Sequence, residues 1–175
     1  DEVGSRGLGD VYKRQGSYRL VLDYRAINNL TTKDAYPLPD VDSNLSQLGN
    51  ANWFSTLDLL MGFHQCEIDE TDGSVLKTAF GTPWGQFAFR RMPMGLTSSP
   101  GTFMRLVDAA LRGLPPGHAV AYCDDVIIPT SGTFEEHVKQ VGEVFTKLIE
   151  SGFTVRADKV HIGMKAVSYT HLRAH

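Results

Sequence analysis

The stretch AVAYCDDVIIPT, residues 119–130, places two neighbouring acids, Asp124 and Asp125, inside a run that otherwise reads as buried. Two adjacent carboxylates repel each other, and an unpaired buried charge costs several kcal/mol, roughly. The apolar residues on either side favour two strands, 118–123 and 126–130, with the acids at the turn between them. A functionless exposed hairpin turn is one interpretation, because Asp favours turns. A metal ion that balances both charges is the other.

Composition limits what the whole chain can be. Its 175 residues suit one domain or part of a larger protein, and 42% hydrophobic with 21% charged residues is typical of a folded globular protein. No run approaches the ~20 apolar residues of a membrane span, so we expect no membrane partner. Two cysteines, Cys66 and Cys123, form no disulfide framework. A net charge of −3 disfavours a free-standing nucleic-acid-binding protein.

The remaining elements follow from periodicity and from residues that start or stop helices. The predicted strands are 18–25, 52–59 and 153–157, with a hairpin made of 75–81 and 84–92. The predicted helices are 98–113 and 133–152, and 36–48 is predicted as a proline-led loop that enters a short helix.

The helix at 133–152 has the clearest signals. Thr133 and Glu136 make a capping box at its start. Its predicted buried stripe consists of Val138, Val141, Phe145 and Leu148.

Setting aside 66–98, the order strand, helix, strand, strand, helix, strand predicts a ferredoxin-like β-α-β-β-α-β sheet. In that α+β fold the first strand lies antiparallel beside the third. Asp58 ends the first strand, and Asp124 and Asp125 occupy the turn before the third. The three acids should therefore meet at one edge of the sheet.

Three converging carboxylates are good ligands for a hard divalent cation such as Mg²⁺, which prefers oxygen donors. Two such ions about 3.5–4 Å apart can activate an attacking oxygen and stabilise a leaving oxygen. Because phosphoryl transfer needs mostly positioning and electrostatics from the protein, this site favours that reaction.

The two ends of the chain differ from the rest. Residues 1–15 show no periodicity, and residues 166–175 do not continue the preceding pattern. Both resemble translated adaptor or vector sequence, so we expect the natural reading frame to cover about residues 16 to 165.

Five blocks carry a family resemblance: YRLVLDYRAIN (18–28), YPLPDVDSNLSQLGNANWFSTLDLLMGFHQCEI (36–68), KTAFGTPWGQFAFRRMPMGLTSSPGTF (77–103), AYCDDVII (121–128) and EEHVKQVGEVFTKLIESGFTV (135–155). In order and spacing, the chain resembles the reverse transcriptases of long-terminal-repeat retrotransposons of the Ty3/gypsy type. The likeness covers roughly residues 16 to 163. Several independent blocks make it more specific than a single motif.

The resemblance implies the fingers and palm of a right-hand polymerase, with the ferredoxin-like sheet and its two helices as the palm. The fingers would be 16–33 and 66–98, and the palm 34–65 and 99–165. Thumb and RNase H would be absent.

The resemblance also implies site residues. Asp58, Asp124 and Asp125 would be catalytic and would hold two Mg²⁺ ions, with Mn²⁺ as an alternative, helped by the carbonyl of Leu59. The residues implied to bind the incoming nucleotide are Arg19, Phe63, Gln65 and Cys123, Phe63 as the aromatic that excludes a ribose 2′-OH. The residues implied to lie near the template–primer are Ser98, Ser99, Pro100 and Tyr122.

Two further basic pairs are left open. Lys13 or Arg14 would stand near the family's second basic contact to the triphosphate. Arg90 and Arg91 would either approach template phosphates or face solvent.

Departures from the family pattern include Leu60 and Met61, Met94, Gly101 and Cys123, none of which removes a metal ligand. Together these departures fit a diverged or decaying copy of the family.

The implied function is an RNA-directed DNA polymerase fragment of a retrotransposon Pol polyprotein, a nucleotidyltransferase that adds dNTPs to a primer 3′-OH. Its partners would be an RNA or DNA template with primer, dNTPs, and the remaining thumb, RNase H and integrase segments. Its location would be the cytoplasm, within virus-like particles, with nuclear entry open to the parent element. The alternatives are an inactive remnant or captured nucleic-acid-binding fragment, and another ferredoxin-like palm such as a nucleotide cyclase.

Overall fold

The structure is a computed structural model that describes residues 11–14, 17–20, 22–34, 36 and 51–165, the first two ranges as backbone only. Most of the segment 36–48, predicted as a loop that enters a short helix, lies outside the described residues. The chain divides into two units, which are described separately. One unit comprises Asp1–Ala35 and Phe63–Thr102, and the other comprises Tyr36–Gly62 and Phe103–His175.

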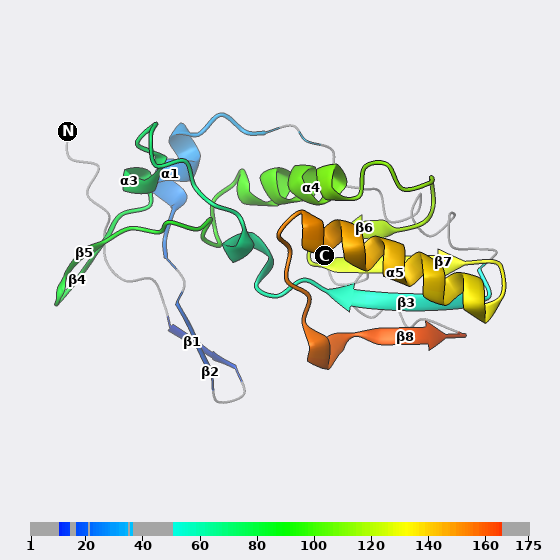
Figure 1. Cartoon of the computed structure of the whole chain (residues 1–175). Helices are drawn as coiled ribbons and strands as arrows, with labels where there is room; N and C mark the ends of the chain where they lie inside the picture. The colour runs from blue at the N-terminus through cyan, green and yellow to red at the C-terminus, as the bar shows by residue number, and fades with distance from the viewer. Residues whose placement is uncertain (1–10, 15–16, 21, 35, 37–50, 166–175) are drawn as a thin grey trace. The chain divides into compact units, whose positions relative to one another are not determined.

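The second unit is built on a four-stranded antiparallel sheet (Figure 1). Its strands are β3 (Trp53–Asp58), β6 (Val120–Tyr122), β7 (Asp125–Thr130) and β8 (His161–Met164). Their spatial order is β6-β7-β3-β8, so the first strand lies beside the third. This order confirms the ferredoxin-like fold that the sequence predicts.

Burial explains how β3 and β7 are held together. On β3, Ser55 and Leu57 are buried at alternate positions, while β7 is buried from Val126 to Pro129. Helix α5 (Phe134–Glu150) packs against β7, β3 and β8. Strand β7, one of the two central strands, is therefore buried on both faces, and this burial fixes its register against β3.

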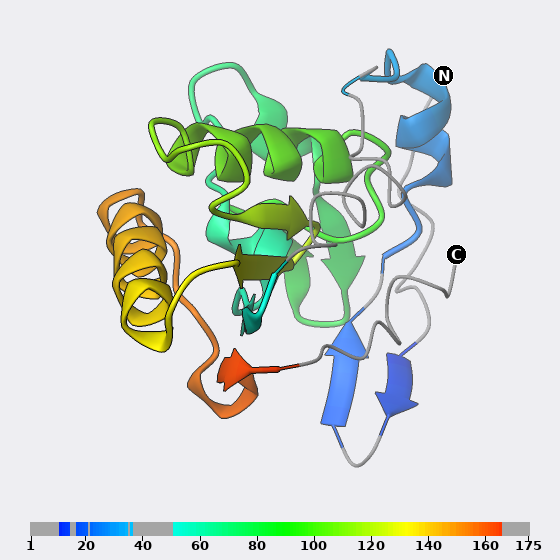
Figure 2. The same cartoon turned by 90° about the vertical axis from the view of Figure 1, so that its right-hand side faces the viewer.

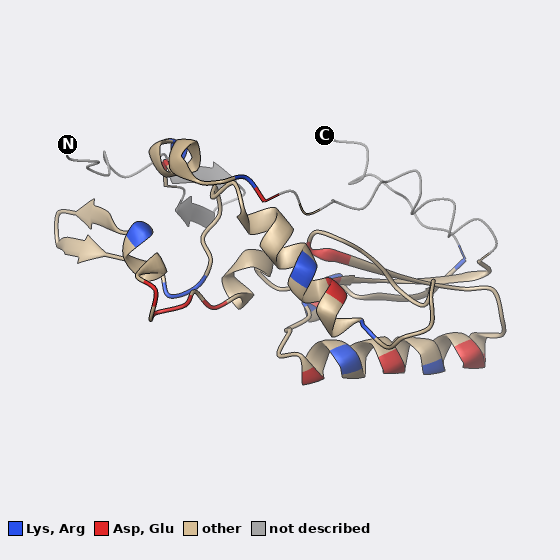
Figure 3. Cartoon of the chain, turned by 90° about the horizontal axis from the view of Figure 1, so that it is seen from above, with Lys and Arg blue, Asp and Glu red and all other residues tan. Residues whose placement is uncertain are grey.

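Helix α5 begins as predicted, since Thr133 and Glu136 form a complete capping box. The predicted stripe is partly wrong. The buried residues of the helix are His137, Gln140, Val141, Val144 and Leu148. Val138 is 48% exposed. Polar partners on the sheet let His137 and Gln140 take the inner face. Along the outer face acidic and basic side chains alternate, including the pair Lys139–Glu143 (Figure 3).

The predicted strand 153–157 is wrong. Val155 makes an isolated bridge to Leu59, and the chain then turns through the 3₁₀ helix η2 (Ala157–Lys159). The edge strand is β8 instead, which pairs with Phe54 and Thr56 in an irregular register. Because Phe153 is buried, the segment 153–157 has the sequence pattern of a strand. Its backbone, however, makes one isolated bridge and not a continuous series of strand hydrogen bonds.

The first unit contains two hairpins and short helices. Strand β1 (Val11–Arg14) pairs with β2 (Ser17–Leu20), drawn in blue in Figure 2. Strand β4 (Phe80–Thr82) pairs with β5 (Gly85–Phe87), which confirms a hairpin there. The 3₁₀ helix η1 (Gly62–Gln65) begins at the unit boundary, and α4 (Ser99–Ala110) crosses it.

Three strand predictions in this unit are too long, and of the strand predicted at 84–92 only Gly85–Phe87 is extended as β5. The strand predicted at 18–25 ends at Leu20, and helix α1 (Arg25–Leu30) begins where Arg25 pairs with Asp23. Part of 75–81 is helix α3 (Ser74–Lys77). The Asp72 carboxylate accepts hydrogen bonds from the Ser74 backbone N–H and hydroxyl, so the chain turns just before α3. In the described ranges, no helix is long and apolar enough to cross a membrane.

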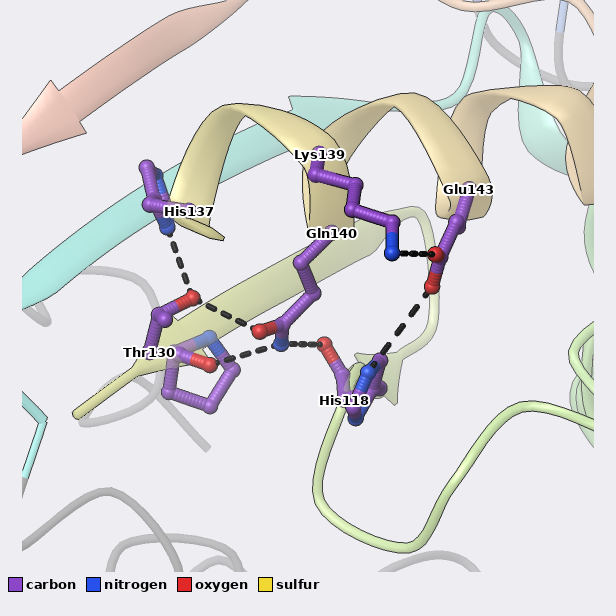
Figure 4. Close-up of polar contacts among 7 residues, drawn as sticks. His118, Thr130, His137, Lys139, Gln140 and Glu143 are labelled. Carbon is purple, nitrogen blue, oxygen red and sulfur yellow. Dashed lines mark hydrogen bonds and ion pairs between the residues drawn. The ribbon is translucent and has the colours of Figure 1, made fainter. Parts of the chain in front are cut away.

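A buried polar network joins α5 to the sheet (Figure 4). His137 is 0% exposed, and its Nε2 and Nδ1 atoms lie 2.7 Å from the Ser55 hydroxyl and 2.8 Å from the Thr130 hydroxyl. Thr130 donates to Oε1 of Gln140, so its oxygen accepts from Nδ1–H of His137. Nε2 then accepts from the Ser55 hydroxyl, and His137 is neutral in this network.

We predict that this network makes stability depend on pH. Burial lowers the pKa of His137 below its ordinary value of 6.5. The unfolded chain therefore takes up a proton first as pH falls. Stability should be complete above about pH 6.5 and decline as pH falls from there through the lower folded pKa. Urea unfolding between pH 7.5 and 5 measures this decline.

His137→Gln is the matched variant, because glutamine is uncharged throughout this range. We expect it to lose about 1–3 kcal/mol at pH 7.5 through poorer hydrogen bonding, and to lack the part of the decline due to His137. Equal pH slopes for both proteins would show that His137 takes up its proton as readily when folded as when unfolded.

Candidate active site

Three acids lie where β3 and β7 meet the β6–β7 turn. Asp58, the last residue of β3, is the register partner of Asp125, the first residue of β7. The backbone N–H of Leu59 donates to the carbonyl of Asp124 at 2.7 Å. The sheet thus holds the three acids next to one another by backbone hydrogen bonds.

The turn that carries Asp124 is strained. Cys123 has a left-handed backbone with φ of 50°, which costs roughly 1 kcal/mol or more for a residue with a side chain. Its N–H lies 3.2 Å from the sulfur of Met104, a buried residue of α4. Burial, followed by the charges of Asp124 and Asp125, raises the pKa of the Cys123 thiol. The thiol is therefore protonated at neutral pH and a poor metal ligand.

Asp124 fits closely against Gly62. Its Oδ1 atom is buried, and a Cβ added at Gly62 would overlap the carboxylate. Only glycine lets the start of η1 approach this acid so closely. The neighbouring Met61 has φ of 53° and is 67% exposed, so the chain turns sharply between β3 and η1.

Asp58 has a cation beside it. Nζ of Lys159, in η2, lies 2.8 Å from Oδ2 of Asp58. The Asp58 side chain is 19% exposed and that of Lys159 is 51% exposed. This ion pair balances part of the negative charge at the edge.

The donors suit a hard divalent cation. Three carboxylates and the Leu59 carbonyl are oxygen ligands of the kind that Mg²⁺ prefers, and one or two carboxylates with substrate phosphates suffice to bind it. Among the described residues, however, no three His, Cys, Asp or Glu side chains are already arranged as a metal-binding group. The chemistry fits, while Asp58 is engaged by Lys159 and the Asp124 carboxylate lies against Gly62.

Phe63 and Gln65, predicted at the nucleotide pocket, lie half-buried in η1 and belong to the first unit. Arg91 positions this helix, because its Nη1 donates to the Gln65 carbonyl at 2.9 Å. Arg91 also pairs with Glu67. Arg19 lies on β2, where only the backbone is described.

The residues predicted to lie near the template–primer differ in how far they are exposed to solvent. Ser98 and Pro100 are half-buried at the start of α4. Ser99 is 1% exposed and donates its hydroxyl to the Pro93 carbonyl at 3.2 Å, a contact that supports the helix start. Tyr122 is half-buried and is the register partner of Asp125.

Sequence reasoning missed Gly62, Met104 and Lys159. Gly62 had a signal, since a glycine four residues after Asp58, in the turn that follows the strand, indicates a close backbone approach. Met104 reads as an ordinary core residue. Lys159 lies 101 residues from Asp58, beyond a segment whose strand was wrongly placed, so nothing local revealed it.

Comparison with known proteins identifies the family. Residues 11–172 match the family described as reverse transcriptase (RNA-dependent DNA polymerase). This range includes residues 11–15 and 166–172, which belong to the two ends that we expected to be adaptor or vector sequence.

Two relatives are polyproteins of Drosophila melanogaster. The retrovirus-related Pol polyprotein from transposon 297 is 41% identical over 87% of this chain and 14% of its own length. The one from transposon gypsy is 35% identical over 97% of this chain and 16% of its own length. The chain thus spans about one seventh of these relatives.

A solved structure of the foamy viral protease–reverse transcriptase in complex with double-stranded DNA matches 91% of this chain and 27% of its own chain. Its TM-score is 0.82 at 32% identity. The chain therefore belongs to the reverse transcriptase family, among the Pol polyproteins of gypsy-type retrotransposons.

Proposed function

We propose that the chain is the fingers and palm part of an RNA-directed DNA polymerase. The observation that carries this is the pairing of Asp58 with Asp125, with Asp124 adjacent, in a member of the reverse transcriptase family. The first unit would act as fingers and the second as palm. Family membership also removes the nucleotide cyclase alternative.

In this function the primer 3′-OH attacks the α-phosphate of a deoxynucleoside triphosphate, and pyrophosphate leaves. Asp58, Asp124 and Asp125, with the Leu59 carbonyl, would hold two Mg²⁺ ions. When bound, the ions would supply charge stabilisation to the attacking and leaving oxygens. The palm's own contribution is to keep these acids on a rigid sheet edge. A template with primer and the rest of the Pol polyprotein complete the machinery, in the cytoplasm or in virus-like particles.

In the first unit, the residues that would bind the incoming nucleotide are Phe63, Gln65 and Arg19. Phe63 and Gln65 are carried by η1, whose end is held by Arg91. Cys123 would adjoin the primer end as part of the turn, and Arg19 would contact the triphosphate through its guanidinium.

In the first unit, Ser98 and Pro100 would lie near the template–primer, and the buried Ser99 would support the start of α4. In the second unit, Tyr122 would lie near the primer.

Primer extension tests the enzymatic proposal. The chain is joined to a thumb segment from a gypsy-type relative and supplied with an RNA template, a DNA primer, dNTPs and Mg²⁺. We expect Asp124→Asn to lower the extension rate about a hundredfold or more, because it removes a charged metal ligand. Asp72→Asn, the same change at an exposed turn of the first unit, should leave the rate unchanged.

Two results would support the inert-remnant alternative instead. One is no extension by the thumb-bearing protein, and the other is an equal rate for Asp124→Asn and the unmodified chain. Binding of the primed template without extension would identify a nucleic-acid-binding fragment.

Sugar selection tests the role of Phe63. Shortening the ring to valine should open space for a 2′-OH, so Phe63→Val should raise the kcat/KM of CTP relative to dCTP about tenfold or more. Single-nucleotide insertion opposite a template G measures both values. Trp84→Val, which shortens an aromatic residue that is 86% exposed on the β4–β5 hairpin, is the control. An unchanged ratio in Phe63→Val would remove Phe63 from the pocket.

A further inference from the structure

The ion pair between Lys159 and Asp58 is built into the fold. The N–H of Arg156 donates to the Asp58 carbonyl at 2.8 Å, and Val155 bridges Leu59. The N–H of Lys159 donates to the Arg156 carbonyl at 3.1 Å, which closes the turn of η2. The backbone therefore carries Lys159 to the end of β3, and its side chain has a short distance to cover.

The neighbouring charges leave Lys159 directed at Asp58. Asp158, the adjacent acid on η2, is held by Arg156 through contacts of 3.2 and 3.3 Å. Asp58 faces Asp125 across the β3–β7 ladder, with Asp124 beside it. Repulsion among these carboxylates favours a cation at this position, and Lys159 supplies one from the chain itself.

We propose that Lys159 is an internal counter-ion that occupies the Asp58 carboxylate and competes with a divalent cation for it. Its ammonium group takes Oδ2 of Asp58, an oxygen that a metal ion would need. Binding of the cation then requires the Lys159 side chain to swing away, which its half-exposed position permits. This inference rests on the proposed function only in treating Asp58 as a metal ligand.

A metal ion must displace an existing ion pair, so its apparent affinity is lower than that of the same carboxylates without the lysine. Since partly exposed ion pairs are of modest strength, we expect the factor to be about three- to tenfold.

Binding of Mn²⁺ to the 175-residue chain, measured by isothermal titration calorimetry without substrate, tests the competition. Lys159→Met should lower the Kd for Mn²⁺ about three- to tenfold, while Lys159→Arg should stay close to the unmodified chain. Lys147→Met removes the same charge from α5, where Lys147 pairs with Glu150, and controls for net charge. If Lys159→Met does not fold, Lys159→Gln takes its place.

A double-mutant cycle separates the local pair from a general effect. In an Asp58→Asn background, Lys159→Met should no longer change the Kd, because the shared carboxylate charge is gone. In EDTA, Lys159→Met should also lower the melting temperature, and saturating Mn²⁺ should reduce or reverse that difference. Both results together support the counter-ion role.

The failures are distinguishable. Equal Kd values for the unmodified chain and Lys159→Met, with Asp58→Asn weaker than both, would overturn the competition and leave the metal site standing. No Mn²⁺ binding by any of these proteins would overturn both the counter-ion role and the proposed metal site. An equal gain in Lys147→Met would reduce the effect to net charge and so overturn the proposal.

Discussion

The antiparallel register of β3 against β7 is the constraint on which the site depends. It sets Asp58 opposite Asp125 and brings the Asp124 carbonyl to the N–H of Leu59. A shift of one residue would turn every side chain of β3 to the other face of the sheet. The buried Leu57 and the buried run of β7 prevent that shift, so the apolar core determines where the acids lie.

Gathering like charges at one edge is unfavourable, and the structure offsets it with several contacts from distant segments. Lys159 places a positive charge on Asp58, and Gly62 makes room for the Asp124 carboxylate. The left-handed backbone of Cys123 adds strain. The contact of its N–H with the sulfur of the buried Met104 offsets part of that strain. Stability at this edge therefore comes from residues outside the acidic motif.

This division explains which features the sequence could predict. Strands β3, β6 and β7 and the capping box of α5 arise from local patterns, and the meeting of the acids follows once the order of elements is recognised. The inner face of α5 was misjudged because His137 finds hydroxyl partners on Ser55 and Thr130, which periodicity cannot reveal. The pairing of Lys159 with Asp58 depends on an irregular turn between Val155 and β8.

The Lys159 counter-ion also helps this acidic edge of the sheet to fold, because it offsets part of the repulsion among the carboxylates. A sheet that brings three carboxylates together must be stable before any cation arrives, and a lysine on the same chain supplies that stability while no metal ion is bound. The same lysine weakens the site for the cation, because one carboxylate oxygen cannot serve both fully. Residues at functional sites commonly trade stability against activity in this way. A half-exposed lysine suits the compromise, since a fully buried ion pair would hold Asp58 too tightly for a cation to displace it.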